Sequence, residues 1–306
     1  MTPTVDFRKK LAQRIEGNGN KSLSDEDLIG FSKEFIEVLG ESNSMSSMKL
    51  YRYMPFNYNN IRSIEKGAIY LSEIGKMNDV FEGLTLVHDS QTIDFKDLHD
   101  LVYLKSFSEE KDNLLMWSHY GDNHKGLCIE YELKHILNQQ DNEKNNLGIL
   151  YHLFPVIYLE NRVDDESAFN NLKYASKSIN QYKSDLKDKN VPEDVEWHKD
   201  IKSLFLIKSK KWEYEKEWRI AVTFMQMNEK DEEPYDGNKV LYNINNQNIP
   251  FDCITSIYFG ANLENDKQEH IEEIVSRLNN DKDKKISVYK NILNPGEYKL
   301  DTELIV

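Results

Sequence analysis

Short runs of β-branched and aromatic residues recur from Lys49 to the end of the chain, and this pattern limits the possible folds more than any other feature. Such runs, bounded by polar and turn-forming residues, are typical of β-strands. Helical periodicity appears between some of them, at 57–67, 93–101 and 265–280, and helices are also predicted within 164–209. We therefore predict an α+β fold with a curved, mixed or mainly antiparallel sheet and flanking helices. The predicted strands cover residues 48–56, 68–72, 101–108, 126–133, 147–161, 218–225, 239–244, 253–260 and 285–293.

The first 48 residues have a different composition from the rest of the chain. Helical periodicity runs over 5–40, where Ser24 is a suitable helix N-cap. Residues 41–48 (ESNSMSSM) are small and polar, as in linkers. We predict a helical N-terminal extension and linker at 1–48, followed by a single α+β domain at 49–306.

The formal net charge of −14 at pH 7 argues against extended binding to duplex nucleic acid, because such binding depends on Lys and Arg side chains that neutralise phosphates. Cys128 and Cys253 lie in apolar runs, which favour buried, reduced thiols over a disulfide or a metal site. No apolar stretch approaches the roughly 18 residues of a membrane helix, and the N-terminus lacks the apolar core of a signal peptide. We therefore expect a cytoplasmic protein that does not bind a membrane.

Two dense clusters of aromatic and polar residues stand out, LMWSHYGDNHKG at 114–125 and KKWEYEKEWRI at 210–220. In the first cluster His119 is a candidate proton carrier. Trp117 is a candidate pocket residue that we expect to anchor the adjacent core. Both clusters combine ring surfaces with titratable groups, so we expect them to build the functional site.

Strand alternation in the second cluster would place Glu213, Glu215 and Glu217 on one face, as a polar floor of the site or as a solvated acidic face. A helical start to this segment would break that arrangement. Residues 77–82 (MNDVFE) predict a turn in which Asn78 and Asp79 bond their own backbone and Phe81 anchors the loop in the core. Asn78 is a candidate pocket residue, and Asp79 and Glu82 are candidate site carboxylates.

Several segments, taken in order from about Leu50 to Val306, resemble the bacterial family known as domain of unknown function number 2971. Members of that family resemble proteins found near abortive-infection and toxin genes, so the resemblance implies a role in phage defence or as a toxin. The segments that carry the resemblance are Tyr51-Arg52-Tyr53, 70–83, 106–109, 114–131, 208–219 and 257–260.

The chain is also similar to the Arg, Ser and Glu pattern of ADP-ribosyltransferases, although neither candidate serine stands in an S-T-S tripeptide. This similarity implies NAD as a substrate and an unknown macromolecule as the acceptor. Arg52 would pair with the pyrophosphate, Ser72 or Ser108 would fix the nicotinamide ribose, and Glu217 would polarise a ribose hydroxyl. The other implied residues are Tyr70 or Tyr120 against the nicotinamide ring, Glu215 at the acceptor, and Arg219 at the cofactor. Tyr51 is a further candidate pocket residue.

Other interpretations of the same residues remain open. Arg52 and Arg219 could form only structural ion pairs with Glu82, Glu215 or Glu217. The cluster could instead bind a nucleotide-like ligand without catalysis, while residues 1–48 dock a partner protein. A nuclease would need Asp79, Glu82 and Glu217 to gather Mg²⁺. No metal site is expected, since His119 and His124 are not spaced as two ligands on one helix face.

Overall fold

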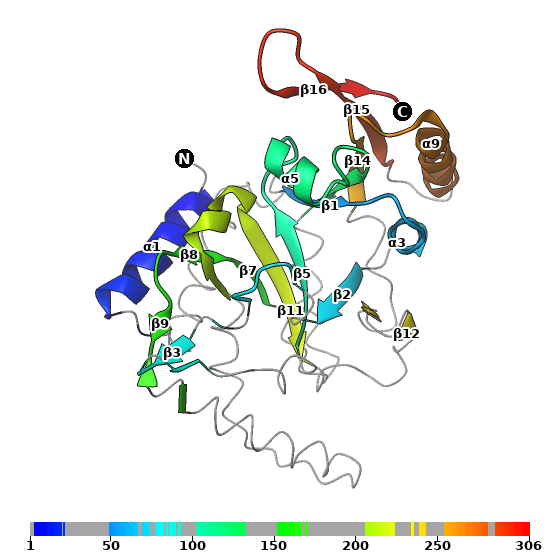
Figure 1. Cartoon of the computed structure of the whole chain (residues 1–306). Helices are drawn as coiled ribbons and strands as arrows, with labels where there is room; N and C mark the ends of the chain where they lie inside the picture. Colours follow the sequence, from blue (N-terminus) through cyan, green and yellow to red (C-terminus); the bar gives the residue numbers. More distant parts are fainter. Residues whose placement is uncertain are drawn as a thin grey trace, which may run out of the picture.

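The computed structural model describes residues 3–19, 21, 49–66, 69–73, 77–82, 84, 86–89, 91–92, 102–132, 152–166, 169–170, 206–223, 234–235, 239–242, 254–280 and 285–306 (Figure 1). These residues form an α+β fold with a mixed sheet, as predicted. The described helices are α1 (Pro3–Gly17), α3 (Tyr58–Lys66), α5 (Leu114–His119), α9 (Asn265–Asn280) and the 3-10 helix η4 (Lys210–Glu215). None of these helices has the length and apolar character needed to cross a bilayer.

The strands of the described residues lie in three sheets. They are β1 (Lys49–Met54), β2 (Ile69–Glu73), β3 (Leu86–His88), β4 (Gln91–Thr92), β5 (Val102–Ser108), β6 (Leu127–Glu132), β7 (His152–Pro155), β8 (Ile157–Leu159), β9 (Val163–Asp164), β10 (Ile207–Ser209), β11 (Glu217–Thr223), β12 (Pro234–Tyr235), β13 (Lys239–Tyr242), β14 (Ile254–Phe259), β15 (Ser287–Leu293) and β16 (Leu300–Leu304). The largest sheet has 11 strands, and β8 pairs with β10 in a separate two-stranded sheet.

Strand β5 is the junction of the largest sheet. Along one edge it pairs with β11 over its whole length, from Ser108 opposite Glu217 to Val102 opposite Thr223. Among the described residues, the other edge pairs with β1 only at Ser108 and with β2 only at positions 103 and 104. Strands β1 and β2 therefore pair with opposite ends of the same edge of β5. The middle of β5 faces the gap between β1 and β2.

The half of the sheet that begins with β1 continues through β6, β14, β15 and β16. Its pairings are antiparallel except for β14 with β15, which agrees with the prediction of a mixed, mainly antiparallel sheet. Helices α3 and α9 flank this half, and Arg277 of α9 contacts Glu65 of α3 at 2.7 Å (Figure 1). Arg52 of β1 therefore lies in the half of the sheet that α3 and α9 flank.

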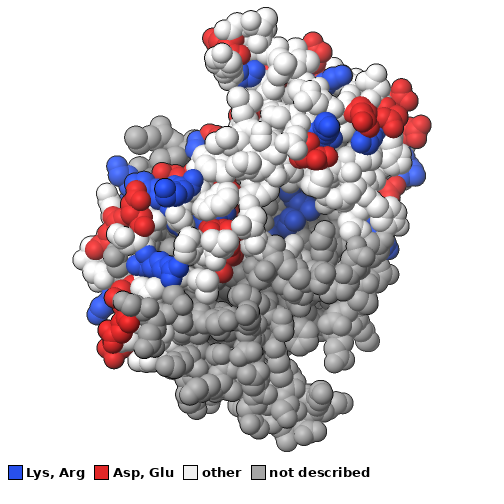
Figure 2. Space-filling model, in the orientation of Figure 1, with Lys and Arg blue, Asp and Glu red and all other residues white. Residues whose placement is uncertain are grey.

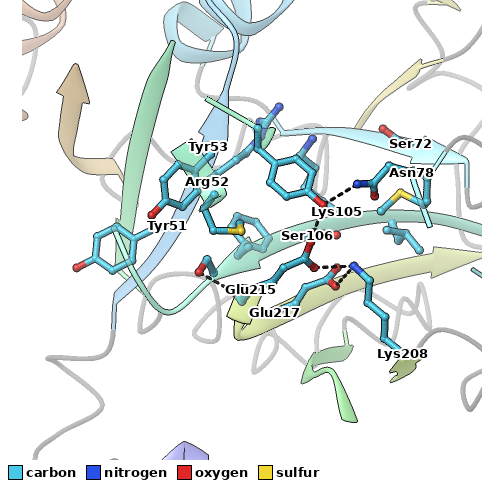
Figure 3. A pocket seen from close by; sticks show the side chains of 16 residues that line it. Tyr51, Arg52, Tyr53, Ser72, Asn78, Lys105, Ser106, Lys208, Glu215 and Glu217 are labelled. Carbon is cyan, nitrogen blue, oxygen red and sulfur yellow. Dashed lines mark hydrogen bonds and ion pairs between the residues drawn. The ribbon is translucent and has the colours of Figure 1, made fainter. Parts of the chain in front are cut away.

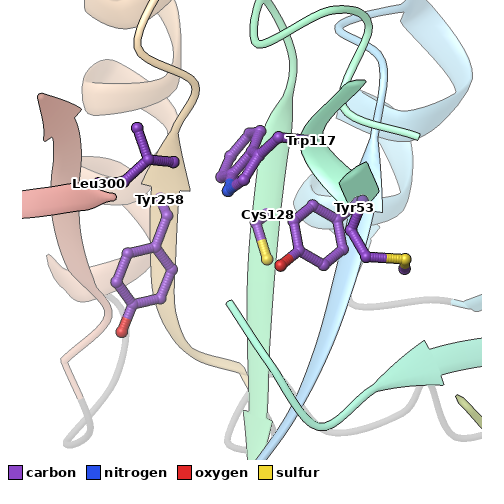
Figure 4. Packing of buried hydrophobic residues seen from close by; sticks show 6 residues of the cluster. Tyr53, Trp117, Cys128, Tyr258 and Leu300 are labelled. Atoms are coloured by element: carbon purple, nitrogen blue, oxygen red, sulfur yellow. The ribbon is translucent and has the colours of Figure 1, made fainter. Parts of the chain in front are cut away.

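An aromatic cluster forms the core between α5 and this half of the sheet (Figure 4). Trp117 is fully buried, and the Tyr53 ring meets its edge at a centroid distance of 5.2 Å. The Trp117 indole donates a hydrogen bond to the main-chain oxygen of Lys111 at 2.9 Å. Cys128 lies in the same cluster as a buried free thiol, as predicted, whereas Cys253 lies outside the described residues.

A tight turn at 121–126 connects α5 to β6. Asp122, Asn123 and His124 have left-handed backbone conformations, with φ of 51°, 53° and 66°. Asp and Asn tolerate this region better than most residues. Gly126 closes the turn where a Cβ would lie 2.2 Å from the Met54 carbonyl oxygen, so only glycine lets β6 begin beside the end of β1.

The structure corrects several predicted elements. Residues 210–215 form η4, the helical start left open for the second cluster, so strand alternation does not apply there and β11 begins at Glu217. Strand β10 lies within the region where only helices were predicted, and α5 and β16 were not predicted. Predictions for 22–48, 93–101 and 171–205 concern residues outside the described ranges. Helix α1 confirms the first part of the helical extension, and it packs against β8 (Figure 1).

Basic and acidic side chains are interspersed on the face of the molecule seen in Figure 2. The described part of this face shows no broad basic patch of the kind that binding to duplex nucleic acid needs.

Candidate functional site

A pocket of about 160 Å³ lies along the middle of β5, between the diverging strands β1 and β2 (Figure 3). The turn at 77–82 and the residue that follows α5 contribute to its wall, and η4 and the start of β11 contribute acidic groups. The sequence candidates that line it are Tyr51, Arg52, Ser72, Asn78, Ser108, Tyr120, Glu215 and Glu217. The two clusters at 114–125 and 210–220 thus meet at one pocket.

Lys208 joins the two glutamates of the pocket. Its ammonium group donates hydrogen bonds to Oε2 of Glu215 at 2.6 Å and to Oε2 of Glu217 at 3.0 Å. All three side chains are almost fully buried. One buried cation therefore holds both carboxylates against the pocket.

Arg219 extends this ion-pair network away from the pocket. It bonds both carboxylate oxygens of Glu217, and it also forms two hydrogen bonds with Glu82. The prediction of a structural ion pair is thus confirmed for Arg219, which does not line the pocket. Glu82 and Glu217 share this guanidinium, so they do not form the open acidic cluster that a Mg²⁺-dependent nuclease would need.

The two glutamates differ in their acidity. Burial alone would raise the pKa of Glu217, but the charges of Arg219 and Lys208 outweigh burial and lower it to about 2. Burial raises the pKa of Glu215 above its ordinary value, and the charge of Lys208 offsets only part of that effect. Glu217 is therefore a fixed negative charge at neutral pH, whereas Glu215 is better suited to proton exchange.

The local backbone explains how both glutamates reach Lys208. Ser209 caps η4, and the turn ends at Lys216 in a left-handed conformation with φ of 44° before β11 begins. This geometry replaces the predicted strand alternation. Glu213 consequently points to solvent, so the predicted row of three acids is wrong and only Glu215 and Glu217 are buried together.

Arg52 is buried in β1, with 5% of its surface exposed. Its Nη2 donates to Oδ1 of Asn60 at 3.2 Å, while Nη1 has no hydrogen-bond partner among the described residues. Burial lowers the pKa of Arg52, and the group that opposes this effect is the Tyr131 phenol rather than a carboxylate. The alternative in which Arg52 pairs with Glu82, Glu215 or Glu217 is therefore wrong.

A second cavity of about 180 Å³ adjoins the first at Arg52. The residues common to both are Arg52, Tyr53, Ser72 and Lys105. The second cavity extends toward the start of α3, where its lining is rich in asparagine, at Asn57, Asn59 and Asn60. Arg52 thus lies where a ligand that spans both cavities would cross.

The two candidate serines have different surroundings. The Ser108 hydroxyl donates to the main-chain oxygen of Glu215 at 2.7 Å and accepts from the amide of Glu110 at 3.2 Å. The first bond fixes the junction of β5 with η4, and the second fixes the end of β5 itself. Ser72 is half-buried and lines both cavities, so it is the better candidate for a ligand contact.

Tyr120 connects the first cluster to the acids. Its hydroxyl donates to Oε1 of Glu215 at 2.5 Å and accepts from Nδ2 of Asn78 at 2.7 Å. Burial and the charge of Glu215 raise the pKa of Tyr120, so the phenol stays protonated and acts as a donor. Its ring, with Tyr53 and Met116, gives the pocket a flat apolar wall.

The remaining candidates lie outside the pocket lining. Asp79 accepts a hydrogen bond from the amide of Phe81 at 3.0 Å, which confirms the Asp79 turn. Phe81, however, is 47% exposed and packs against the Arg162 guanidinium, so the prediction that it anchors the loop in the core is wrong. His119 is exposed, with Nδ1 3.0 Å from the Tyr214 hydroxyl.

Trp117 belongs to the core, as expected, and is a support for Tyr53 rather than a pocket residue. The Tyr70 side chain is outside the described residues.

Sequence reasoning missed Lys208 and Lys105 as pocket residues. Lys208 stands in a Lys-rich run, which is typical of a solvated surface. Its burial depends on the parallel pairing of β10 with β8, which no local pattern indicates. The signal that was available is its place nine residues before Glu217, at the start of the second cluster.

Residues 116–220 match the model of a family described as protein of unknown function (DUF2971), which supports over this segment the resemblance predicted from the sequence motifs. This segment includes Tyr120, Lys208 and both pocket glutamates, whereas Arg52 and Ser72 precede it. No curated protein and no solved structure matches the chain.

Proposed function

We propose that this chain, whose residues 116–220 belong to the DUF2971 family, binds NAD in the two adjoining cavities and transfers its ADP-ribose group to a macromolecular acceptor. The observation that carries the proposal is the buried guanidinium of Arg52, which has no carboxylate partner among the described residues. A buried charge without a counter-charge is costly unless a ligand supplies one. A pyrophosphate matches the planar donors of arginine and would supply that charge.

The size and lining of the first cavity fit one end of such a ligand. Its volume of about 160 Å³ is similar to the roughly 150 Å³ of an engineered cavity that takes up benzene, so it has room for a single ring. The rings of Tyr53 and Tyr120 and the thioether side chain of Met116 offer apolar surface that a nicotinamide would pack against. The rest of the dinucleotide would pass Arg52 and Ser72 toward the second cavity.

Glu217 and Glu215 would have different roles in the reaction. In the proposed reaction the bond between ribose C1′ and the nicotinamide nitrogen breaks, and its electron pair leaves with the nicotinamide, whose ring becomes neutral. The fixed charge of Glu217 would stabilise the oxocarbenium-like ribose. An acceptor oxygen or nitrogen would then bond to C1′ and give its proton to Glu215, from which the proton passes to solvent.

Binding is tested with ADP-ribose, measured by calorimetry on the full chain. We expect Arg52→Met to weaken ADP-ribose binding by at least about tenfold, while the free energy of unfolding stays equal or rises because an uncompensated buried charge is removed. Arg277→Met is the matched control, since this arginine is 62% exposed on α9. Equal ADP-ribose affinity in both variants would contradict the assignment of Arg52.

Catalysis is tested by nicotinamide release from NAD in the presence of cell lysate as a source of acceptors. We expect release by the wild type and its loss in Glu217→Gln, with near-ultraviolet circular dichroism as the check on folding. Glu213→Gln, in the same segment but exposed, should release nicotinamide at the wild-type rate. Absence of release by folded wild-type protein that also fails to bind ADP-ribose would overturn the proposal.

One observation favours a second candidate, a non-catalytic domain that senses a nucleotide-like ligand. Both carboxylates of the pocket already accept hydrogen bonds, Glu215 from Tyr120 and Lys208, and Glu217 from Arg219 and Lys208. A site whose acids are satisfied before the ligand arrives is suited to binding. ADP-ribose affinity without nicotinamide release would support this candidate over the transferase.

A further inference from the structure

Arg8 of helix α1 contacts the main chain of Glu217, the first residue of β11. Arg8 makes three hydrogen bonds to residues more than 100 positions away: Nη2 to the main-chain oxygen of Glu217 at 2.7 Å, Nη1 to Oε1 of Glu109 at 2.6 Å, and Nε to the main-chain oxygen of Val156 at 3.2 Å. Its guanidinium also lies 5.8 Å from the centroid of the Trp218 ring. One side chain thus connects α1 to three other parts of the fold.

Both polar groups of the Glu217 main chain, the N–H and the carbonyl oxygen, form hydrogen bonds. Its N–H donates to the Tyr158 hydroxyl at 2.8 Å, and its carbonyl oxygen accepts from the Val156 amide at 2.9 Å in addition to Arg8. Glu217 directly follows Lys216, whose left-handed backbone ends η4 just before β11 begins.

Glu109 completes the arrangement. Its Oε1 accepts hydrogen bonds from both Arg8 and the Trp218 indole, at 2.6 and 2.7 Å. The side chains of Arg8 and Glu109 are only 11% and 12% exposed. Shielding of this degree makes their ion pair stronger than one on the open surface. Loss of Arg8 would therefore affect Trp218 as well as Glu217.

We propose that Arg8 is a positioning residue for Glu217, and that α1 is a working part of the site rather than only a lead-in to the domain. The inference rests on the proposed function for its effect on catalysis. Arg8 would act through the backbone of Glu217, keeping its carboxylate in line with the pocket. Displacements of about 1 Å at such groups reduce rates by up to roughly a hundredfold.

The experiment compares Arg8→Met, Arg8→Lys and the control Lys9→Met in the full chain. Lys9 is the exposed neighbour on α1. We expect Arg8→Met to lower kcat for nicotinamide release by about tenfold or more, with the ADP-ribose dissociation constant within about twofold of wild type. Arg8→Lys should recover part of kcat, since it keeps the charge beside Glu109, and Lys9→Met should match the wild type.

A second measurement is independent of turnover. Hydrogen exchange followed by mass spectrometry should show faster exchange of the amides of Val156 and Glu217 in Arg8→Met but not in Lys9→Met. If wild-type protein releases nicotinamide and Arg8→Met equals Lys9→Met in kcat, the inference is overturned. If the wild type releases no nicotinamide, the proposed function fails by itself, and hydrogen exchange then decides the inference. Faster amide exchange at Glu217 in Arg8→Met supports the inference. Unchanged exchange at Glu217 overturns it.

Discussion

The guanidinium of Arg219 holds the carboxylate of Glu217 through two hydrogen bonds, 2.7 Å from Nε to Oε1 and 3.0 Å from Nη2 to Oε2. The same guanidinium bonds both oxygens of Glu82, so one buried cation ties β11 to the turn at 77–82. When one member of a buried ion group is removed, its partners remain buried without compensation. The stability of the site therefore depends on all members of the network.

Glu82→Gln should lower the free energy of unfolding by about 1–3 kcal/mol, because Arg219 loses a buried carboxylate partner, while the burial that raises the pKa of Glu82 offsets part of the ion pair. Urea denaturation followed by circular dichroism measures the change. Glu213→Gln, which alters an exposed acid, should stay within about 0.5 kcal/mol of the wild type. A Glu82→Gln variant as stable as Glu213→Gln would show that the Arg219 network contributes little.

Acid should remove the stabilisation that comes from Glu217. Its pKa falls from an ordinary value of 4.5 to about 2 in the folded state, so its contribution is present above pH 4.5 and is lost as the pH falls from 4.5 toward 2. The stability difference between wild type and Glu217→Gln, measured in urea at several pH values, should therefore shrink over this range.

Glu215 provides the opposite case for the same measurement. Its pKa is raised in the folded state, so its contribution is most favourable below the ordinary pKa and is lost as the pH rises through the folded value. The difference between wild type and Glu215→Gln should thus grow as the pH falls. Parallel trends for the two variants would contradict the assignment of a low pKa to Glu217 and a raised one to Glu215.

Strands β1, β6 and β14 and helix α9 were predictable because their patterns are local. The alternation of apolar residues, or their helical spacing, is written within a few consecutive positions. The segment 210–216 left a strand and a helical start both open, because alternating charged and aromatic residues suit a strand, whereas its actual turn depends on the Ser209 cap and on the left-handed Lys216. No periodicity distinguishes these two outcomes.

The site was predictable only in part, for a related reason. Clusters of chemically active residues mark the segments that hold Tyr120 and Glu215, and the antiparallel register of β11 with β5 then brings the second cluster to the pocket. The contacts of Lys208 and Arg8 depend on how distant segments pack, over 209 positions in the case of Arg8 and Glu217. A lone charged residue gives no signal of such a partner.

Tyr120→Phe should shift the pH dependence of nicotinamide release. The Tyr120 hydroxyl donates to Glu215 and lowers the pKa of that carboxyl, so its removal raises the pKa further. If Glu215 must be ionised to take the acceptor's proton, the acidic limb of the kcat profile should move to higher pH. Tyr214→Phe, which removes a hydroxyl near His119 instead, should leave that limb in place. Identical profiles for both variants would exclude Glu215 as the proton acceptor.

Gly126→Ala should destabilise the protein through the backbone of β1 rather than through a side chain. The added Cβ would lie 2.2 Å from the Met54 carbonyl oxygen and 2.9 Å from that of Gly121, and neither backbone group can turn aside as a flexible side chain would. We expect a loss of about 1–3 kcal/mol in the free energy of unfolding, as for other overpacked sites. Because β1 also carries Arg52, ADP-ribose affinity should fall in the fraction of protein that remains folded.

Gly17→Ala at the end of α1, where a Cβ meets nothing within 4 Å, is the control and should be as stable as the wild type or slightly more so. Equal denaturation midpoints for the two variants would mean that the 121–126 turn can open without cost to the sheet.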